Sequence, residues 1–252
     1  MLSKAKIKLI QSLGQKKKRR EEQLFVAEGP KVVSDLLPHF PCRLIIATQA
    51  WLSQHPQIKA AEVIEITEKE LCSASFLKAP QDVLAIFEIP QHRLPADNVT
   101  EELCLALDDI QDPGNLGTII RIADWFGIKH IFCSIGTVDA YSPKTIQATM
   151  GAIARVNVHY VNLPDFLQTI RTQYPLVPIY GTFLEGNDIY NEPLSTNGII
   201  VMGNEGNGIS LATKLHINDK LFIPNFPKGS ATSESLNVAI ATAITCSEFR
   251  RR

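Results

Sequence analysis

Three segments in the C-terminal 150 or so residues place short polar side chains directly after apolar runs, at turns rich in glycine, proline or serine. They are residues 108–121, 199–209 and 221–241. An apolar run of this kind is typical of a buried parallel strand, and ligands of parallel sheets bind at the carboxyl ends of the strands. We therefore expect the three turns to contribute to one binding site.

The first segment contains Asn115 and Arg121 at the start of a predicted helix. At about 100° per residue, the apolar residues of this helix form a stripe about 120° wide. They are Leu116, Ile119, Ile120, Ala123 and Phe126. Arg121 lies outside the stripe, so the buried face does not need it. Taken alone it would be an ordinary surface arginine, but beside the turn it is a candidate for chemistry.

The second and third segments carry weaker individual signals. Gly203, Gly206 and Gly208 let the backbone approach a ligand closely, but their spacing is not that of a dinucleotide fingerprint. In the third segment a strand ends at Pro224, and a polar loop leads into an apolar helix that we expect to begin at about Ser235. Ser233 or Ser235 would cap this helix, whose first turn also supplies free N–H groups.

Taken together, the segments are far more specific. Asn115 and Arg121, then Gly203-Asn-Glu205-x-x-Gly208, then Ile223-Pro with Ser235-Leu-Asn237-Val-Ala occur in this order. They resemble the three signature motifs of the SpoU (TrmH-type) branch of the SPOUT methyltransferases, over residues 103–252. Residues 24–37 (LFVAEGPKVVSDLL), with the basic stretch before them, are similar to the N-terminal substrate-binding domain of rRNA-directed members.

The resemblance implies an S-adenosylmethionine-dependent RNA 2′-O-ribose methyltransferase. The fold class would be α/β, with a parallel-sheet SPOUT domain that contains a trefoil knot, preceded by a small α/β RNA-binding domain. Members of the family are homodimers with the site near the subunit interface. The positions that would contact the cofactor are Thr182, Gly203, Ile223 and Leu236. The signature polar positions, taken as catalytic, are Asn115, Arg121, Glu205, Ser235 and Asn237.

The chemistry of methyl transfer leaves the role of Arg121 open between two possibilities. A ribose hydroxyl must lose its proton as it attacks, yet the three segments contain no histidine or cysteine to act as an ordinary base. A guanidinium has a pKa above about 12, which favours clamping the RNA phosphate and stabilising the developing alkoxide. Proton removal by Arg121 itself is the other possibility. The loop of residues 224–235 is longer than the family pattern, which puts the roles of residues 230–233 in doubt.

Charge is unevenly distributed along a nearly neutral chain. The 252 residues carry a net charge of −1, yet eight of the 25 Lys and Arg residues lie in the first twenty positions, without an acidic residue among them. We expect this stretch to contact RNA phosphates, although it could also be a solvated tail. The predicted RNA-binding residues are Lys16, Lys17, Lys18, Arg19, Arg20 and Arg121.

Composition excludes several other classes of protein. The five cysteines are scattered and form no metal-ligand spacing with the six histidines, so we expect free thiols, no metal site and a cytoplasmic location. No apolar run approaches the roughly 20 residues that span a bilayer. An oxidoreductase would need a glycine fingerprint, which residues 112–117 do not supply.

The chain divides into an N-terminal RNA substrate-binding domain (1–92), a linker (93–102) and a methyltransferase domain (103–252). The stretch from Pro90 to Asn98 is rich in proline and polar residues, which places the linker there, and apolar strands alternate with helices after it. Before it, a helix over residues 3–13 and a basic turn precede a small α/β unit. The alternatives for function are a tRNA 2′-O-methyltransferase and a non-catalytic RNA-binding protein of the same fold. The sequence does not identify the target nucleotide.

Overall fold

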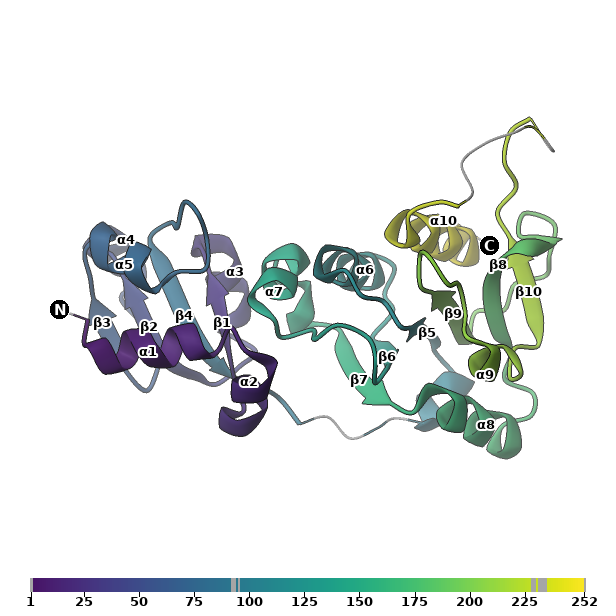
Figure 1. The fold of residues 1–252 in the computed structure, drawn as a ribbon, viewed down its shortest axis with the longest axis horizontal. Coiled ribbons are helices and arrows are strands. Elements are labelled where there is room, and N and C mark those ends of the chain that lie inside the picture. The colour runs from purple at the N-terminus through teal and green to yellow at the C-terminus, as the bar shows by residue number, and fades with distance from the viewer. Residues whose placement is uncertain (1, 92–93, 95, 228–229, 231–234, 252) are drawn as a thin grey trace. The chain divides into compact units, whose positions relative to one another are not determined.

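The computed structural model describes residues 2–91, 94, 96–227, 230 and 235–251 and contains two compact units (Figure 1). The first comprises residues 1–91 together with 139–154, and the second comprises residues 92–138 and 155–252. Residues 139–154, which lie inside the predicted methyltransferase domain, therefore pack with the N-terminal residues. The chain passes between the units three times.

The first unit is built on a four-stranded mixed sheet of order β1-β4-β2-β3. β4 is antiparallel to both β1 and β2, and β3 is parallel to β2. Its core includes Ile10, Val26, Ile46 and Leu84, all nearly inaccessible to solvent. The elements are α1 (Lys4–Ser12), α2 (Lys16–Glu22), β1 (Leu24–Glu28), α3 (Pro30–Leu36), β2 (Cys42–Ala47), α4 (Gln49–Gln54), β3 (Val63–Glu65), α5 (Glu68–Ala74), β4 (Val83–Glu88), α7 (Pro143–Thr149) and a 3₁₀ turn, η2 (Ala152–Ala154).

One element of this unit differs from the sequence-based expectation. The basic stretch, predicted as a turn, forms the helix α2. Five consecutive cations give no apolar periodicity that would indicate a helix. The helix forms because the Arg19 side chain is buried and bound to Asp139, a tertiary contact that local sequence does not reveal.

The second unit contains a six-stranded sheet of order β10-β8-β9-β5-β6-β7, in which every pair of neighbours is parallel. This confirms the predicted α/β class with a parallel sheet. The elements are a 3₁₀ turn, η1 (Ala96–Thr100), β5 (Leu103–Asp108), α6 (Pro113–Trp125), β6 (His130–Ser134), β7 (Asn157–Val161), α8 (Leu163–Gln173), β8 (Ile179–Asp188), β9 (Gly198–Gly203), α9 (Leu211–Lys214), β10 (Asp219–Phe222) and α10 (Val238–Arg251).

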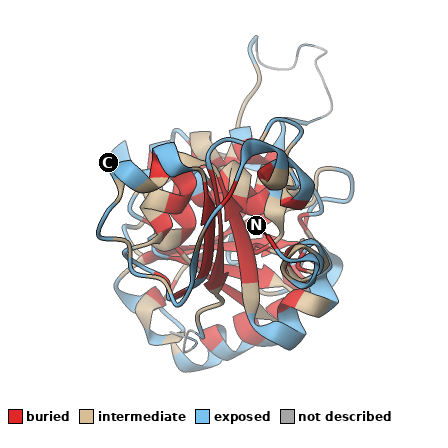
Figure 2. Ribbon diagram, turned by 90° about the vertical axis from the view of Figure 1, so that its left-hand side faces the viewer, coloured by how far each residue is buried: buried red, intermediate tan, exposed pale blue. Residues whose placement is uncertain are grey.

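Helices cover both faces of this sheet. α6 and α10 pack together on one face, and α8 and α9 lie on the other (Figure 1). All six residues of β5 are buried, as expected for a central strand with both faces covered, and the buried residues follow the strands in Figure 2. On the α8 side, Phe132 packs in one cluster with Leu167 and Val201. Among the described residues, no helix is long and apolar enough to cross a membrane. The trefoil knot stays an expectation from the family resemblance.

Candidate active site

The sheet has a switch point between β5 and β9, where two of the motif segments meet. From β5 the chain proceeds to β6 and β7 on one side, then returns through β8 and β9 to the other side. Asp108, the last residue of β5, pairs with Gly203, the last residue of β9. Such a reversal leaves a crevice at the carboxyl ends of the strands, which is the usual ligand site of open parallel sheets.

The start of α6 follows directly from β5. The side chain of Asp112 caps the helix by accepting a hydrogen bond from the Asn115 backbone N–H at 2.8 Å, and Pro113 occupies the first turn. The helix therefore begins at Pro113, three residues before Leu116, the first residue of the apolar stripe seen in the sequence. This cap fixes the backbone of Asn115 close to the carboxyl end of β5.

The turn after β9 is held by Asn204. Its side-chain amide donates to the Asp109 carbonyl oxygen at 2.8 Å, and its oxygen accepts from the backbone N–H groups of Gly206 and Asn207 at 2.8 and 3.1 Å. Two backbone hydrogen bonds between Asn204 and Gly208 close the turn. The turn is thereby attached to the end of β5 and not merely to its own strand.

Three predicted polar residues, one from each motif segment, form a connected hydrogen-bond cluster. The side-chain amide of Asn115 donates to Oε1 of Glu205. Its oxygen, Oδ1, accepts from the side-chain amide of Asn237 at 3.0 Å. Asn115 uses both ends of its amide in this way, so the three segments are held in one place, as the sequence predicted.

Asn237 also determines where α10 begins. Its Oδ1 accepts from the backbone N–H groups of Ala239 and Ile240 at 3.0 and 3.3 Å, which is the role of a helix cap. The predicted start at Ser235 is therefore wrong, since the helix begins at Val238. The expected cap at Ser235 is replaced by Asn237, and Ser233 lies outside the described residues.

Arg121 lies on the exposed side of α6, two turns after the helix cap. The apolar stripe identified from the sequence is buried at Leu116, Ile119, Ile120 and Ala123, while Phe126 is half-buried. In the described part of the chain, the Arg121 guanidinium forms no hydrogen bond or ion pair. Its position on the helix matches the expectation that it is not a packing residue.

The predicted cofactor-contacting residues lie where the sheet opens. The ladder between β8 and β9 ends at Gly181 and Val201, and the register of β8 with β10 passes from Gly181 directly to Asn187. Thr182 is the first residue beyond this point, and its hydroxyl donates to the Val201 carbonyl oxygen at 3.4 Å. β9 continues alongside β5 to Gly203. β8 and β9 therefore separate beside the Gly203 turn.

The remaining predicted residues follow β10. Ile223, the residue after this strand, is half-buried, and Leu236 is 45% exposed. Ser235 is exposed. In the loop between Ile223 and Ser235, the Ser230 hydroxyl donates to the Pro227 carbonyl oxygen at 2.8 Å. Residues 228–229 and 231–234 of this longer loop lie outside the described residues, so its role stays as the sequence left it.

Sequence reasoning did not single out two residues that organise the site. Asp112 caps α6, and Asn204 attaches the turn after β9 to the Asp109 carbonyl. Both carry signals that could have identified them. Asp directly before Pro at a helix start is typical of an N-cap, and Asn commonly bonds to backbone groups within turns.

Two protein-family models match this chain, and together they cover most of it. The family model described as the SpoU rRNA Methylase family matches residues 102–247, more than half of the chain. The chain belongs to the SpoU rRNA methylase family. A second model, the MRM3-like substrate binding domain, matches residues 4–85. Both resemblances seen in the sequence are therefore confirmed.

The similarity to known proteins extends over nearly the whole chain. The 23S rRNA (guanosine(2553)-2'-O)-methyltransferase RlmP of Bacillus subtilis (strain 168) is 29% identical over 97% of this chain and 96% of its own length. A TrmH-family structure from Porphyromonas gingivalis is 44% identical, with a TM-score of 0.90 over 100% of this chain and 99% of that one. The AdoMet-bound rRNA methyltransferase from Sinorhizobium meliloti is 31% identical, with a TM-score of 0.85 over 100% and 96%. SpoU methyltransferases use S-adenosylmethionine, so the predicted enzyme class and cofactor are confirmed for this family.

The residues at the open edge of the sheet fit such a cofactor. Ile223 and Leu236 leave apolar surface accessible, and the backbone of Gly203 at the end of β9 is not fully buried. Thr182 adds a hydroxyl at the point where β8 leaves the ladder. A mixed apolar and backbone lining is the usual composition of small-molecule sites.

Proposed function

We propose that this protein transfers a methyl group from S-adenosylmethionine to the 2′-hydroxyl of a ribose in ribosomal RNA. The observation that carries the proposal is the Asn115–Glu205–Asn237 cluster, which connects all three motif segments at the switch point of the sheet. Curated relatives named as 23S rRNA 2′-O-methyltransferases support ribosomal RNA as the substrate.

Each group of residues has a distinct task in this proposal. Thr182, Gly203, Ile223 and Leu236 would hold the cofactor, which supplies a methyl carbon already activated by its sulfonium. Since the methyl group needs no further activation, the protein must position the ribose and assist loss of its hydroxyl proton.

Arg121 is assigned to the reacting hydroxyl and its neighbouring phosphate. Its guanidinium is exposed and uncommitted within the described residues, so it is available to bind an anion. A fixed cation beside the developing alkoxide lowers the barrier to attack, and a bidentate contact to phosphate would orient the ribose. Asn115, Glu205 and Asn237 hold the loops around it, and Ser235 lies next to Leu236 at the same edge.

The basic helix α2 is assigned to phosphate contacts outside the reacting nucleotide. Lys16, Lys17 and Arg20 line an open surface hollow together with Glu21. Lys18 is also accessible, whereas Arg19 is only 2% exposed. The proposed phosphate contacts therefore rest on the other four basic residues of the stretch.

The proposed location is the cytoplasm, where ribosomal RNA is available to a bacterial-type enzyme.

The proposed assembly is a homodimer. Trp125 at the end of α6 is 85% exposed, and Ile240 on the neighbouring helix α10 is 53% exposed. Large apolar side chains exposed on two packed helices favour a protein interface. A second copy of the chain is the expected occupant of this face.

A methylation assay tests the proposed function. Purified protein is incubated with radiolabelled S-adenosylmethionine and either ribosomal RNA or tRNA from a strain that lacks the corresponding gene. We expect label in ribosomal RNA, at one nucleotide that becomes resistant to alkaline cleavage because its 2′-hydroxyl is blocked. Label confined to tRNA would favour the alternative substrate. Cofactor binding without transfer to any RNA would indicate a non-catalytic RNA-binding protein.

A further inference from the structure

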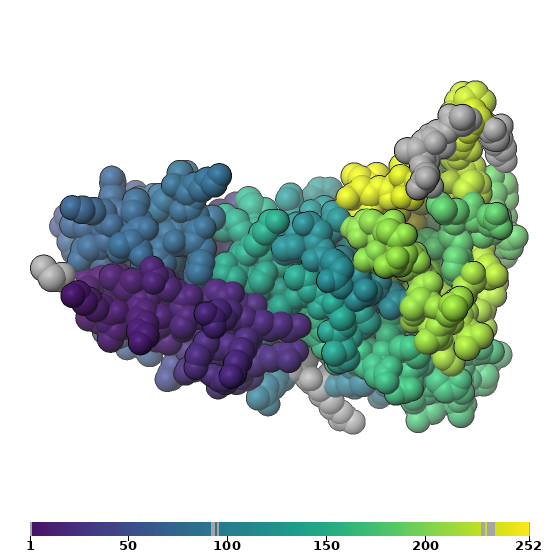
Figure 3. All heavy atoms as spheres, in the orientation of Figure 1, coloured from purple at the N-terminus to yellow at the C-terminus, as the bar shows by residue number. Residues whose placement is uncertain are grey.

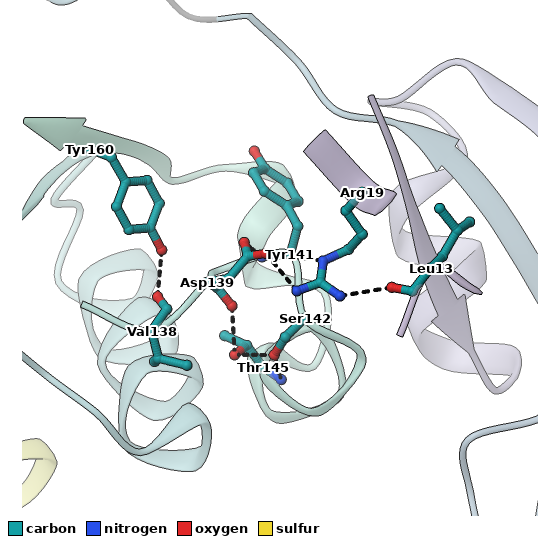
Figure 4. Close-up of polar contacts among 8 residues, drawn as sticks. All are labelled: Leu13, Arg19, Val138, Asp139, Tyr141, Ser142, Thr145 and Tyr160. Carbon is teal, nitrogen blue, oxygen red and sulfur yellow. Dashed lines mark hydrogen bonds and ion pairs between the residues drawn. The ribbon is translucent and has the colours of Figure 1, made fainter. Parts of the chain in front are cut away.

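Arg19 stands out within the basic stretch because it is buried, whereas Lys16, Lys17 and Arg20 are exposed and Lys18 is half-buried. Figure 4 shows its contacts. Its Nε and Nη2 donate to Oδ2 of Asp139 at 3.0 and 2.6 Å. Its Nη1 donates to the Leu13 carbonyl oxygen at 2.7 Å. The guanidinium therefore connects the end of α1 to the segment of residues 139–154.

Asp139 is itself fixed by its own segment. Its Oδ1 accepts from the Tyr141 backbone N–H at 2.9 Å, and its backbone oxygen accepts from the Thr145 hydroxyl at 3.0 Å. The Tyr141 ring packs on Phe25 of β1, with ring centroids 5.1 Å apart. The acceptor for Arg19 is thus held by two hydrogen bonds and an aromatic contact, and it does not depend on α2 for its position.

The orientation of α2 follows from this attachment. At about 100° per residue, Lys16, Lys17 and Arg20 fall within about 100° of one another, and Arg19 lies about 110° from the middle of that group. These three residues line one hollow, and the N-terminal helices lie on the surface drawn in Figure 3 (dark purple). Lys18 lies about 150° from the middle of this group, and its ammonium pairs with Glu21 at 2.7 Å. With Arg19 fixed, the basic face is directed outward.

Helix α2 needs such an attachment. It has seven residues, and helices shorter than about 12 residues are marginal in isolation. Three lysines occupy its first turn, where the helix dipole disfavours positive charge. Without the buried contact, neither the helix nor the spacing of its cations would be well defined.

We propose that Arg19 and Asp139 form a positioning pair that holds α2 so that Lys16, Lys17 and Arg20 meet successive phosphates of the RNA. Arg19 then acts through its neighbours and not by touching RNA. The positioning aspartate comes from inside the region matched by the methylase family, whereas the cations come from the region matched by the substrate-binding domain. This proposal rests on RNA being the substrate.

The Asp139→Asn variant distinguishes positioning of α2 by Arg19 from a direct contact between Arg19 and RNA. Removing a carboxylate beside a basic surface should, by charge alone, leave RNA binding unchanged or strengthen it. Positioning predicts the opposite. We expect the Kd for ribosomal RNA to rise about tenfold, and the slope of log Kd against log salt to fall by about 1 to 2, because one or two phosphate contacts are lost. The matched control is Glu68→Gln, which removes one exposed carboxylate from the same unit and should leave both quantities unchanged.

The full chain is used throughout, and circular dichroism together with cofactor affinity reports folding. The kcat at saturating RNA should stay within about twofold, so that the defect appears in the KM for RNA alone. Arg19→Lys provides a second test, since it preserves the charge but cannot bind Asp139 and Leu13 with the same fork of donors. Weakened RNA binding in Arg19→Lys supports the proposal even if Asp139→Asn does not fold.

Wild-type or tighter RNA binding by folded Asp139→Asn would overturn the positioning pair. If Arg19→Met weakened binding in the same assay, Arg19 would contact RNA itself. This outcome leaves the proposed methylation standing as long as the wild-type protein methylates RNA. A wild-type protein that methylates no RNA would remove the proposed function instead.

Discussion

Asn115 donates a hydrogen bond from its side-chain amide to the carboxylate of Glu205, 90 positions further along the chain. Asn115 follows β5 and Glu205 follows β9, and the carboxyl ends of these two neighbouring strands lie at the same edge of the sheet. Because Asn115 also accepts from Asn237, one small amide sets the relative positions of three loops. A polar residue that connects three loops should matter more to catalysis than to global stability.

Asn115→Asp tests this connection with almost no change in size. The aspartate cannot donate to Glu205, and the two carboxylates would repel each other. Since displacement of a positioning group by about 1 Å can lower a rate about 10²-fold, we expect kcat to fall by about that factor. Steady-state methylation kinetics measure it, with exposed Asn191→Asp in the same unit as control. An undiminished kcat would show that the cluster is not required for the reaction.

Arg121→Ala should abolish methyl transfer and leave cofactor binding nearly intact. Removing one preorganised group that stabilises developing charge typically lowers kcat by about 10²- to 10³-fold. Arg121→Lys should recover only part of the activity, because an ammonium lacks the bidentate geometry of a guanidinium. Calorimetry with S-adenosylmethionine and a single-turnover assay measure the two quantities. Arg171→Ala, an exposed arginine on α8, is the control. Near-normal turnover in Arg121→Ala would remove this residue from the mechanism.

Gly203→Ala and Gly206→Ala form a matched pair within one turn. A Cβ at Gly203 would lie 2.4 Å from both the Gly208 carbonyl carbon and the Ile209 nitrogen, so the turn would have to move. At Gly206 the nearest atom to a new Cβ is Asn204 Oδ1 at 3.5 Å, an ordinary contact. We expect cofactor affinity to drop at least about tenfold for Gly203→Ala, with a stability loss of about 1–3 kcal/mol. Gly206→Ala should resemble the wild type in calorimetry and thermal unfolding. An equal loss of cofactor affinity in both variants would show that the close backbone contact at Gly203 is not what cofactor binding requires.

Much of the fold could be predicted because its signals are local. Thr67 and Glu70 have the spacing of a capping box, and Ser142-Pro143 is a favourable helix start; the structure contains both. The apolar runs that predicted parallel strands correspond to β5, β6 and β9, whose residues are almost all buried. These features depend on the spacing of a few residues, which the sequence displays directly.

What could not be predicted depends on partners far away in the sequence. The helix at Lys16–Glu22 is stabilised by Asp139, 120 positions from Arg19, and a run of cations does not indicate it. The start of α10 was misplaced because Asn237 competes successfully with Ser235 as the cap. At the site, the motifs identified the residues to be brought together, but the Asn115–Glu205 and Asn237–Asn115 contacts are tertiary information.

The cysteines allow a prediction about reactivity in the folded state. Burial raises the pKa of Cys42 to about 11, and raises the pKa values of Cys104 and Cys246 each to about 12. It also raises the pKa of Cys133, whereas Cys72 is exposed. Only the thiolate reacts with a disulfide reagent, and raised pKa values make thiolates scarcer at a given pH.

At pH 8 we therefore expect Ellman's reagent to modify one thiol per folded chain rapidly, and all five after unfolding in guanidinium chloride. Cys72→Ser should remove the rapid phase and keep methylation activity. Raising the pH to 9 should still leave the four buried thiols slow, because both their pKa values and their inaccessibility oppose reaction. A second rapid thiol in the native protein would mean that one of the buried cysteines is reached by local opening. Cys42, the first residue of β2, would be the first to test by substitution because it is 7% exposed, whereas Cys104, Cys133 and Cys246 are fully buried.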